Sequence, residues 1–494
     1  MNKYILTLLT TLIATSVTYP EAMKEGLVSS TNASYDGNAL LLTGHVVLDH
    51  GLGKMNAEEA SLEKQEAGKD FPFSLIHLKK EVFLSLKNHA HLSCDVAQLD
   101  FNQLKGYLTA PQKGFVCYTD TILNKGKDGV KVSLESQRIE LSMLKIEKGD
   151  QKAEYDIETL KAKESVKVNY DSNFLLEAEE ALYRRLGGSL AAKEFQGIIS
   201  AYPKDDQSHC KVIHFQDEVL ARSIDLDLQR STLSMHQSQG TIHTSFLPDL
   251  QKGLLQFNTE HFIWNEPDSL LTLKGKSFIQ ESSLGTISSE ELLTIQQGML
   301  GDKKVISKVE SRGPAEFIYM DPSSKSSHKL KCFGQMKIDR EHLSARLTSP
   351  KKEAKQSRFT GQIYYEESIM GAYADAAAVE FAAEGTLLQP ITMHLKGNVC
   401  LFSRNPQEPF RCGIADRMHF SPETKTLILC ANPGQKVLFW DEQQAVRMSA
   451  QEVHLTVNPL NQQTVIQGVG NVKFSLSTEE NEALKNVFPQ FKPL

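Results

Sequence analysis

The sequence contains no excess of basic side chains. Its 494 residues include 54 Lys and Arg against 61 Asp and Glu, which gives a formal net charge of −7. Proteins that grip nucleic acid neutralise phosphates with clustered Lys and Arg, often interleaved with aromatic side chains, and no such cluster occurs in this sequence. We therefore expect no nucleic-acid partner.

The sequence also lacks the short motifs of common enzymes. It contains no His-Glu-x-x-His, no Gly-x-Ser-x-Gly and no P-loop. His89 and His91 lie two residues apart on an expected strand, but no third ligand follows nearby, which favours a solvated pair over a metal site. We expect no enzyme activity, no catalytic residue, no cofactor and no metal.

Cysteine is scarce and has no metal-binding spacing. The sequence contains no Cys-x-x-Cys pair, and its odd number of cysteines leaves at least one thiol unpaired within the chain. The favoured interpretation is small buried apolar residues with one or two disulfides, whose pairing stays open. The seven residues are Cys94, Cys117, Cys210, Cys332, Cys400, Cys412 and Cys430.

The N-terminal apolar run is too short for a membrane-spanning helix. The uncharged stretch extends from Tyr4 to Val17, whereas a spanning helix needs about 20 apolar residues. Ala14 and Ser16 have the small side chains of a cleavage site. Residues 1–18 are therefore predicted to be a cleaved export signal, and the mature protein is predicted to be exported.

Alternating apolar strands with an internal glycine recur along the chain. Clear examples are residues 40–48 and 395–401, and looser ones are residues 332–338 and 468–474. Because successive strand residues point to opposite faces, each example places its apolar residues and its glycine on one face. Gly44, Gly397 and Gly470 are expected to let the strands bend rather than to contact a ligand. The residues predicted to face inward are Leu40, Leu42, Val46, Leu48, Leu395, Val399, Leu401, Val472 and Phe474.

A second pattern also recurs: a small residue, an acid, any residue and another small residue. It occurs at residues 57–60, 94–97, 178–181 and 374–377. Aromatic or β-branched strand formers follow several of these copies, which favours strand over helix. The sequence therefore predicts an all-β chain of many short antiparallel strands, arranged as two or three stacked modules that share a continuous apolar interior. A capping box at Ser477–Glu480 predicts one short helix, residues 479–488, at the C-terminus.

The two patterns occur together in an order that resembles the OstA/LptA-like family, the periplasmic β-jellyroll modules of lipopolysaccharide transport, which also form the N-terminal domain of LptD. The first match is YDGNALLLTGHV (35–46) followed by MNAEEA (55–60). The second is GNV (397–399), ADRMHF (415–420), TLIL (426–429), PG (433–434), VLFW (437–440), AQEV (450–453) and QGVGNV (467–472). On this basis residues 19–145 and 351–494 are assigned to two such modules, and the looser match at 146–350 to one or more middle modules.

The resemblance implies a periplasmic protein of outer-membrane biogenesis that holds lipopolysaccharide acyl chains in an apolar β-groove. Its partners would be lipopolysaccharide, or a lipid A-type glycolipid, and other bridge components that pair with its sheet edges. The nine inward residues above are then the groove candidates, although as plain core residues they would have the same sequence pattern. A secreted structural rod, or adhesin-like protein, with a closed core stays open as an alternative. A polysaccharide-active enzyme is less favoured, because it would need a polar groove.

Overall fold

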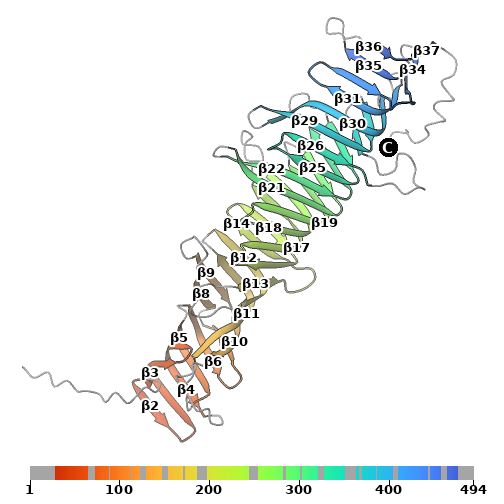
Figure 1. The fold of residues 1–494 in the computed structure, drawn as a ribbon. Coiled ribbons are helices and arrows are strands. Elements are labelled where there is room, and N and C mark those ends of the chain that lie inside the picture. Colours follow the sequence, from red (N-terminus) through yellow and green to blue (C-terminus); the bar gives the residue numbers. More distant parts are fainter. Residues whose placement is uncertain are drawn as a thin grey trace, which may run out of the picture. The chain divides into compact units, whose positions relative to one another are not determined.

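The computed structural model of this chain is all-β, as predicted (Figure 1). Its described residues form 37 strands and no helix. The expected export signal and C-terminal helix lie outside the described residues. The described ranges are 28–64, 73–87, 90–112, 114–122, 130–146, 154–170, 173–185, 197–243, 254–281, 285–300, 303–320, 327–350, 363–366, 370–384, 387–403, 410–442, 446–457 and 464–476.

The described chain divides into two compact units. Unit 1 contains the described residues up to Val116 and those of Glu140–Ile157. Unit 2 contains Cys117–Ile139 and the described residues from Glu158 onward. The expected division into modules at residues 145 and 350 stays a prediction.

The strands of unit 1 are mostly long. They are β1 (Val28–Ser29), β2 (Asn32–Tyr35), β3 (Ala39–His50), β4 (Gly53–Glu63), β5 (Leu75–Leu86), β6 (His91–Asp100) and β7 (Lys105–Thr109). Three strands contain residues of both units: β8 (Val116–Ile122), β10 (Arg138–Ile146) and β11 (Glu154–Tyr170).

Unit 2 contains the remaining strands. They are β9 (Val130–Ser136), β12 (Phe174–Arg185), β13 (Gly197–Tyr202), β14 (Cys210–His214), β15 (Asp217–Ala221), β16 (Ser223–Asp227), β17 (Thr232–His243), β18 (Leu254–Asn265), β19 (Leu270–Glu281), β20 (Gly285–Ser289), β21 (Leu292–Leu300), β22 (Lys303–Arg312), β23 (Ala315–Met320), β24 (Ser327–Cys332), β25 (Gln335–Asp339), β26 (Ser344–Thr348), β27 (Ile363–Glu366), β28 (Met370–Ala374), β29 (Ala376–Glu384), β30 (Leu387–Ser403), β31 (Arg411–Ser421), β32 (Thr426–Cys430), β33 (Val437–Asp441), β34 (Val446–Ala450), β35 (Glu452–Val457), β36 (Thr464–Val469) and β37 (Lys473–Leu476).

The long strands of unit 1 bend in the middle. β3, β4, β5 and β6 pair antiparallel in this order, and each pairing shifts register near the midpoint of the strands. In β3 the shift falls at Gly44 and His45, whose φ angles are 76° and 49°, and in β5 it falls at Lys80 and Glu81, with φ of 62° and 52°. A register shift with positive φ is a bulge that bends the strand. The bends of neighbouring strands lie next to one another and form a continuous line across the sheet. We call this line the crease, and we call the two parts of the sheet on either side of it the walls.

Unit 2 also has creased strands, among them β17, β18 and β19, which lie side by side (Figure 1). Wall A contains, in order of pairing, β13, β16, the first half of β17, the second half of β18, the first half of β19, β21, β22, β25, β26, β29, the first half of β30, the second half of β31, β32, β35 and β36. Wall B contains β14, β15, the other halves of β17, β18 and β19, β20, β23, β24, β27, β28, the other halves of β30 and β31, β33, β34 and β37.

The two recurring sequence patterns meet at the crease. In unit 1, Thr43 pairs with Glu59 and Val46 with Ala57, so Glu58 of the second pattern lies opposite the bulge at Gly44. In unit 2, the pairing of β30 with β31 shifts at Gly397, whose φ is 78°. Only glycine adopts this conformation at little steric cost, which explains its recurrence. The expectation that Gly44, Gly397 and Gly470 serve strand bending agrees with their positive φ angles of 76°, 78° and 74°.

Tight turns with the same hydrogen bonds join several pairs of neighbouring strands. Asp227 Oδ1 accepts hydrogen bonds from the backbone N–H groups two and three residues later, and Ser231, four residues later, has a φ of 47°. Asp100 and Asp339 make the same two bonds, and the fourth residue after each also has positive φ. The carboxylate thus satisfies the N–H groups that the turn frees.

Candidate functional site

The two walls of unit 2 face each other across a shared interior. Phe257 and Phe262 lie on either side of the crease in the same strand, and their ring centroids are 5.2 Å apart. Both side chains are buried. Leu160 and Tyr183 belong to the cross-strand row that reaches Ile199 of wall A, and Leu134 and Val168 belong to the row that reaches Val212 of wall B. A small cavity in unit 2 is lined by Tyr118, Asp120, Val132, Leu134, Leu160, Val168, Tyr183, Ile199 and Leu228. The inward side chains of both walls therefore build one interior.

A continuous row of buried side chains, here called line A, crosses wall A. Each member is the direct cross-strand partner of the next, and every member is at most 9% exposed. Ser311 is the one polar member. Line A contains Ile224, Met235, Phe262, Leu273, Leu293, Ser311, Met336, Leu347, Ala377, Leu395, Met418, Leu429 and Val453.

Wall B carries a matching row, here called line B. It contains Val212, Val219, Gly240, Phe257, Ile279, Ile287, Phe317, Leu330, Tyr365, Ala372, Leu401, Gly413, Phe439, Met448 and Phe474. Apart from the Tyr365 hydroxyl, line B contains only apolar side chains and glycines. Lines A and B together define an apolar trough, which is our candidate functional site.

Most of the residues predicted to face inward are buried. Leu42, Val46 and Leu48 of unit 1 are 1–2% exposed, and Leu40 is half-buried. In unit 2, Leu395 lies on line A and Leu401 on line B, at 4% and 7% exposure. Val399 is completely buried and lies two residues nearer the crease than Leu401.

The last two predicted residues, Val472 and Phe474, face the interior but are exposed. Phe474 pairs with the buried Met448 on line B, and a Cβ built on Gly468 would contact both Met448 and Val472. Their exposed fractions are nonetheless 44% and 53%. They lie on or next to β37, where line B ends among the described strands, so fewer described neighbours cover them than cover Leu401.

The middle of line B is more open than either of its flanks. Ile287, Phe317, Leu330 and Tyr365, on four strands that pair in sequence, are half-buried, whereas Phe257 and Leu401 on either side are buried. One cavity between the walls, near the N-terminal end of unit 2, is much smaller than a lipid chain. Its volume is about 10 Å³, room for about one water molecule.

A row of buried hydroxyl groups lies beside the crease in wall B, which the sequence patterns did not reveal. Ser238, Thr259, Ser277 and Ser289 are successive cross-strand partners, all at most 6% exposed. Thr259 Oγ1 and Ser277 Oγ lie 2.7 Å apart and share a hydrogen bond. Small side chains fit the narrow space at the bend, and alternation alone could not distinguish these positions from outward-facing serines.

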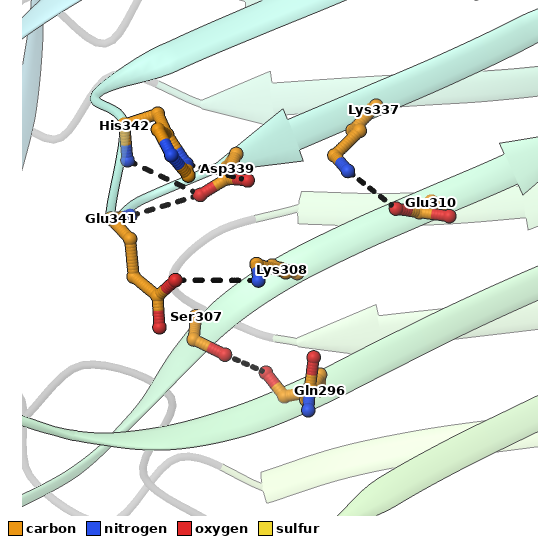
Figure 2. A network of polar contacts seen from close by, with 8 residues as sticks. All are labelled: Gln296, Ser307, Lys308, Glu310, Lys337, Asp339, Glu341 and His342. Carbon is orange, nitrogen blue, oxygen red and sulfur yellow. Dashed lines mark hydrogen bonds and ion pairs between the residues drawn. The ribbon is translucent and has the colours of Figure 1, made fainter.

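The outer surface of β22 and β25 carries a polar network (Figure 2). Asp339 accepts hydrogen bonds from the backbone N–H groups of Glu341 and His342, and its Oδ2 lies 3.0 Å from His342 Nδ1. Burial acts to raise the pKa of Asp339, but the bonds from His342 and the charges of His342 and Lys308 outweigh it and lower that pKa. Lys308 Nζ lies 3.3 Å from Glu341 Oε2. An ammonium group and turn N–H groups thus already satisfy these carboxylates.

The cysteines are mostly buried, as the sequence suggested, but the expected one or two disulfides are not formed, because all seven cysteines are free thiols. Cys94, Cys210, Cys332, Cys400 and Cys412 are buried thiols. Burial raises the pKa of Cys210 to about 12, so this thiol stays protonated and unreactive near neutral pH. Cys400 and Cys412 lie 4.0 Å apart, Sγ to Sγ, and pack against Trp440.

His91, the described member of the His89–His91 pair, stacks on Phe83 with ring centroids 5.4 Å apart.

No protein-family model matches the sequence, and no curated protein matches it. Within the described ranges, no helix is long and apolar enough to cross a membrane. The resemblance to the OstA/LptA-like family therefore stays a prediction.

Proposed function

We propose that this protein is a periplasmic lipopolysaccharide-binding protein that holds the lipid's acyl chains in the apolar trough. In this proposal it forms part of a bridge to the outer membrane. The observation that carries the proposal is the pair of apolar rows, line A and line B, that face one interior across successive strands of unit 2. Acyl chains exposed to water cost about 0.8 kcal/mol per CH₂, so a carrier needs such a surface.

Two details of line B support entry of a lipid. Its middle residues, including Phe317 and Leu330, are half-buried, so the apolar interior is partly accessible from outside. Phe474 at its end is 53% exposed although it faces the interior. An exposed apolar face at a sheet edge favours pairing with another strand, which is how modules would join into a bridge.

One observation favours a second candidate function, a closed structural β-rod. Val399 is completely buried, and the cavity near the N-terminal end of unit 2 has room for only about one water molecule. In the transport proposal the walls move apart to admit acyl chains. In the rod they stay packed, and the trough residues serve only as core.

Phe474 and Leu438 offer a matched pair of variants that separates these functions. Phe474 faces the interior and is 53% exposed, whereas Leu438 points outward from wall B and is 48% exposed. Because both are already exposed, Phe474→Glu and Leu438→Glu should both fold. We expect Phe474→Glu to weaken binding of purified lipopolysaccharide roughly tenfold, since about 1.4 kcal/mol of lost apolar contact corresponds to that factor. Leu438→Glu should bind as the parent does.

The measurement is competition for a fluorescent lipopolysaccharide by the full-length chain, with circular dichroism as the folding control. A folded parent chain that fails to bind lipopolysaccharide would support the closed rod. Equal losses of lipopolysaccharide binding in the two variants would show that the trough does not hold the lipid.

A further inference from the structure

Two pairs of histidine side chains have the same arrangement on wall A of unit 2. His236 and His261 are direct cross-strand partners, and their Nδ1 atoms lie 3.2 Å apart. His394 and His419 are also direct partners with Nδ1 atoms 3.2 Å apart. In each pair the ring centroids are separated by 4.5 Å. The same local geometry thus occurs twice in one wall.

Both pairs lie on the outer face of the wall. The residues next to the first pair, Met235 and Phe262, are inward members of line A, and so are Leu395 and Met418 beside the second pair. Strand alternation therefore points all four imidazoles away from the trough. The four rings are partly or largely accessible to solvent.

The separation of the nitrogen atoms suits one bound metal ion. Imidazole nitrogen binds Zn²⁺ at about 2.0–2.1 Å, so two such nitrogens 3.2 Å apart would subtend an angle of roughly 100° at the ion, close to the tetrahedral value. Two Nδ1 atoms at this distance cannot both carry a proton directed at the other. They share either one proton or one cation.

We propose that each pair, His236 with His261 and His394 with His419, binds a divalent transition-metal ion such as Zn²⁺ through its two Nδ1 atoms. Water completes the coordination. Imidazole is a preferred ligand of Zn²⁺, Cu²⁺ and Ni²⁺, and the sheet holds both rings of a pair in place before the ion arrives. This site is separate from the trough, so it does not depend on the proposed lipid binding.

Neighbouring charges set the strength of these sites. Lys274 is the direct partner of His261, so its side chain is on the same outer face as the first pair. The direct outer partners of the second pair, Ala378 and Ile428, are uncharged, but Lys396 and Arg417 lie one pair further along the same face. We expect Lys274→Ala to tighten metal binding at the first pair about three- to tenfold by removing Coulomb repulsion.

Isothermal titration of Zn²⁺ into the untagged, metal-free full-length chain at pH 7.5 tests the proposal. We expect two Zn²⁺ ions per parent chain, one in His261→Ala, one in His419→Ala and none in the double variant. His77→Ala is the matched control, because His77 has Gln98 rather than histidine as its direct partner. It should keep two sites.

Circular dichroism checks that each variant keeps its sheet. No zinc binding by the parent chain, or a double variant that binds as the parent does, would overturn the proposal. A loss seen in only one single variant would overturn it for the other pair.

Discussion

Gly397 and Asp375 lie in direct contact at the crease of unit 2. The backbone N–H of Asp375 donates to the carbonyl oxygen of Gly397 at 2.9 Å, and Asn398 Nδ2 donates to Asp375 Oδ2 at 2.7 Å. A Cβ built on Gly397 would lie 2.7 Å from Asp375 Oδ2. The glycine of one sequence pattern therefore packs against the acid of the other.

Gly397→Ala should destabilise the crease more than a change at a glycine with open surroundings. Gly434 is the matched control, because its φ is 83° but a Cβ there would meet nothing within 4 Å. Positive φ alone costs a residue with a Cβ about 1–2 kcal/mol, so Gly434→Ala should lose about that much. Gly397→Ala should lose more, because Asp375 must also move. Hydrogen exchange across β29–β31 and around residue 434 measures both, and equal effects would contradict the contact.

Two substitutions in the buried hydroxyl row should have different effects on local stability. Thr259→Val removes the hydrogen bond to Ser277 and should lower the free energy of local opening by about 1 kcal/mol. Ser289 Oγ is buried without a hydrogen-bond partner in the described part of the chain, so Ser289→Ala should leave that free energy unchanged or raise it. Hydrogen exchange of β18–β20 measures both variants. A similar loss of this free energy in the two variants would contradict the prediction, because it would mean that Ser289 Oγ is hydrogen-bonded as Thr259 Oγ1 is.

The turn at Asp339 should weaken in acid. The pKa of Asp339 lies below its ordinary value of 3.8, so the ionised carboxylate is favoured in the folded state. Its contribution is therefore fully present above about pH 4–5 and is lost as the pH falls through the lowered pKa.

Asp339→Asn should cost about 1 kcal/mol of local stability at pH 7 and much less at pH 3. The readout is exchange of the β25–β26 amides at the two pH values. Glu341→Gln is the control, because Glu341 is exposed and its ion pair with Lys308 contributes little. A cost for Asp339→Asn that is independent of pH would contradict the assignment.

The positions of strands, and the face on which each side chain lies, could be predicted from the sequence because alternation is a local property. Leu42, Val46, Leu395 and Leu401 are buried where the pattern placed them inward. The positive φ of Gly397 also agrees with the expected bend. These properties follow from a few neighbouring residues and need no knowledge of strand partners.

Features that depend on register could not be predicted in this way. The two histidine pairs and the hydroxyl row arise because residues 12 to 25 positions apart become direct partners, and no local pattern specifies that register. The exposure of Phe474 likewise depends on which strands follow β34 and β37, not on alternation.

The most direct test of the transport account is photocrosslinking in cells at residues on either side of one wall. A photoreactive side chain at Phe317 would face the trough, and one at the adjacent Ile318, also half-buried, would face outward. Leu401, on the inner face of wall B, and Lys396, on the outer face of wall A, provide a second inward and outward pair on β30. The account predicts lipopolysaccharide adducts at Phe317 and Leu401 and none at Ile318 and Lys396. A folded, exported protein that gives no adduct at either inward position, or equal adducts on both faces, would contradict it.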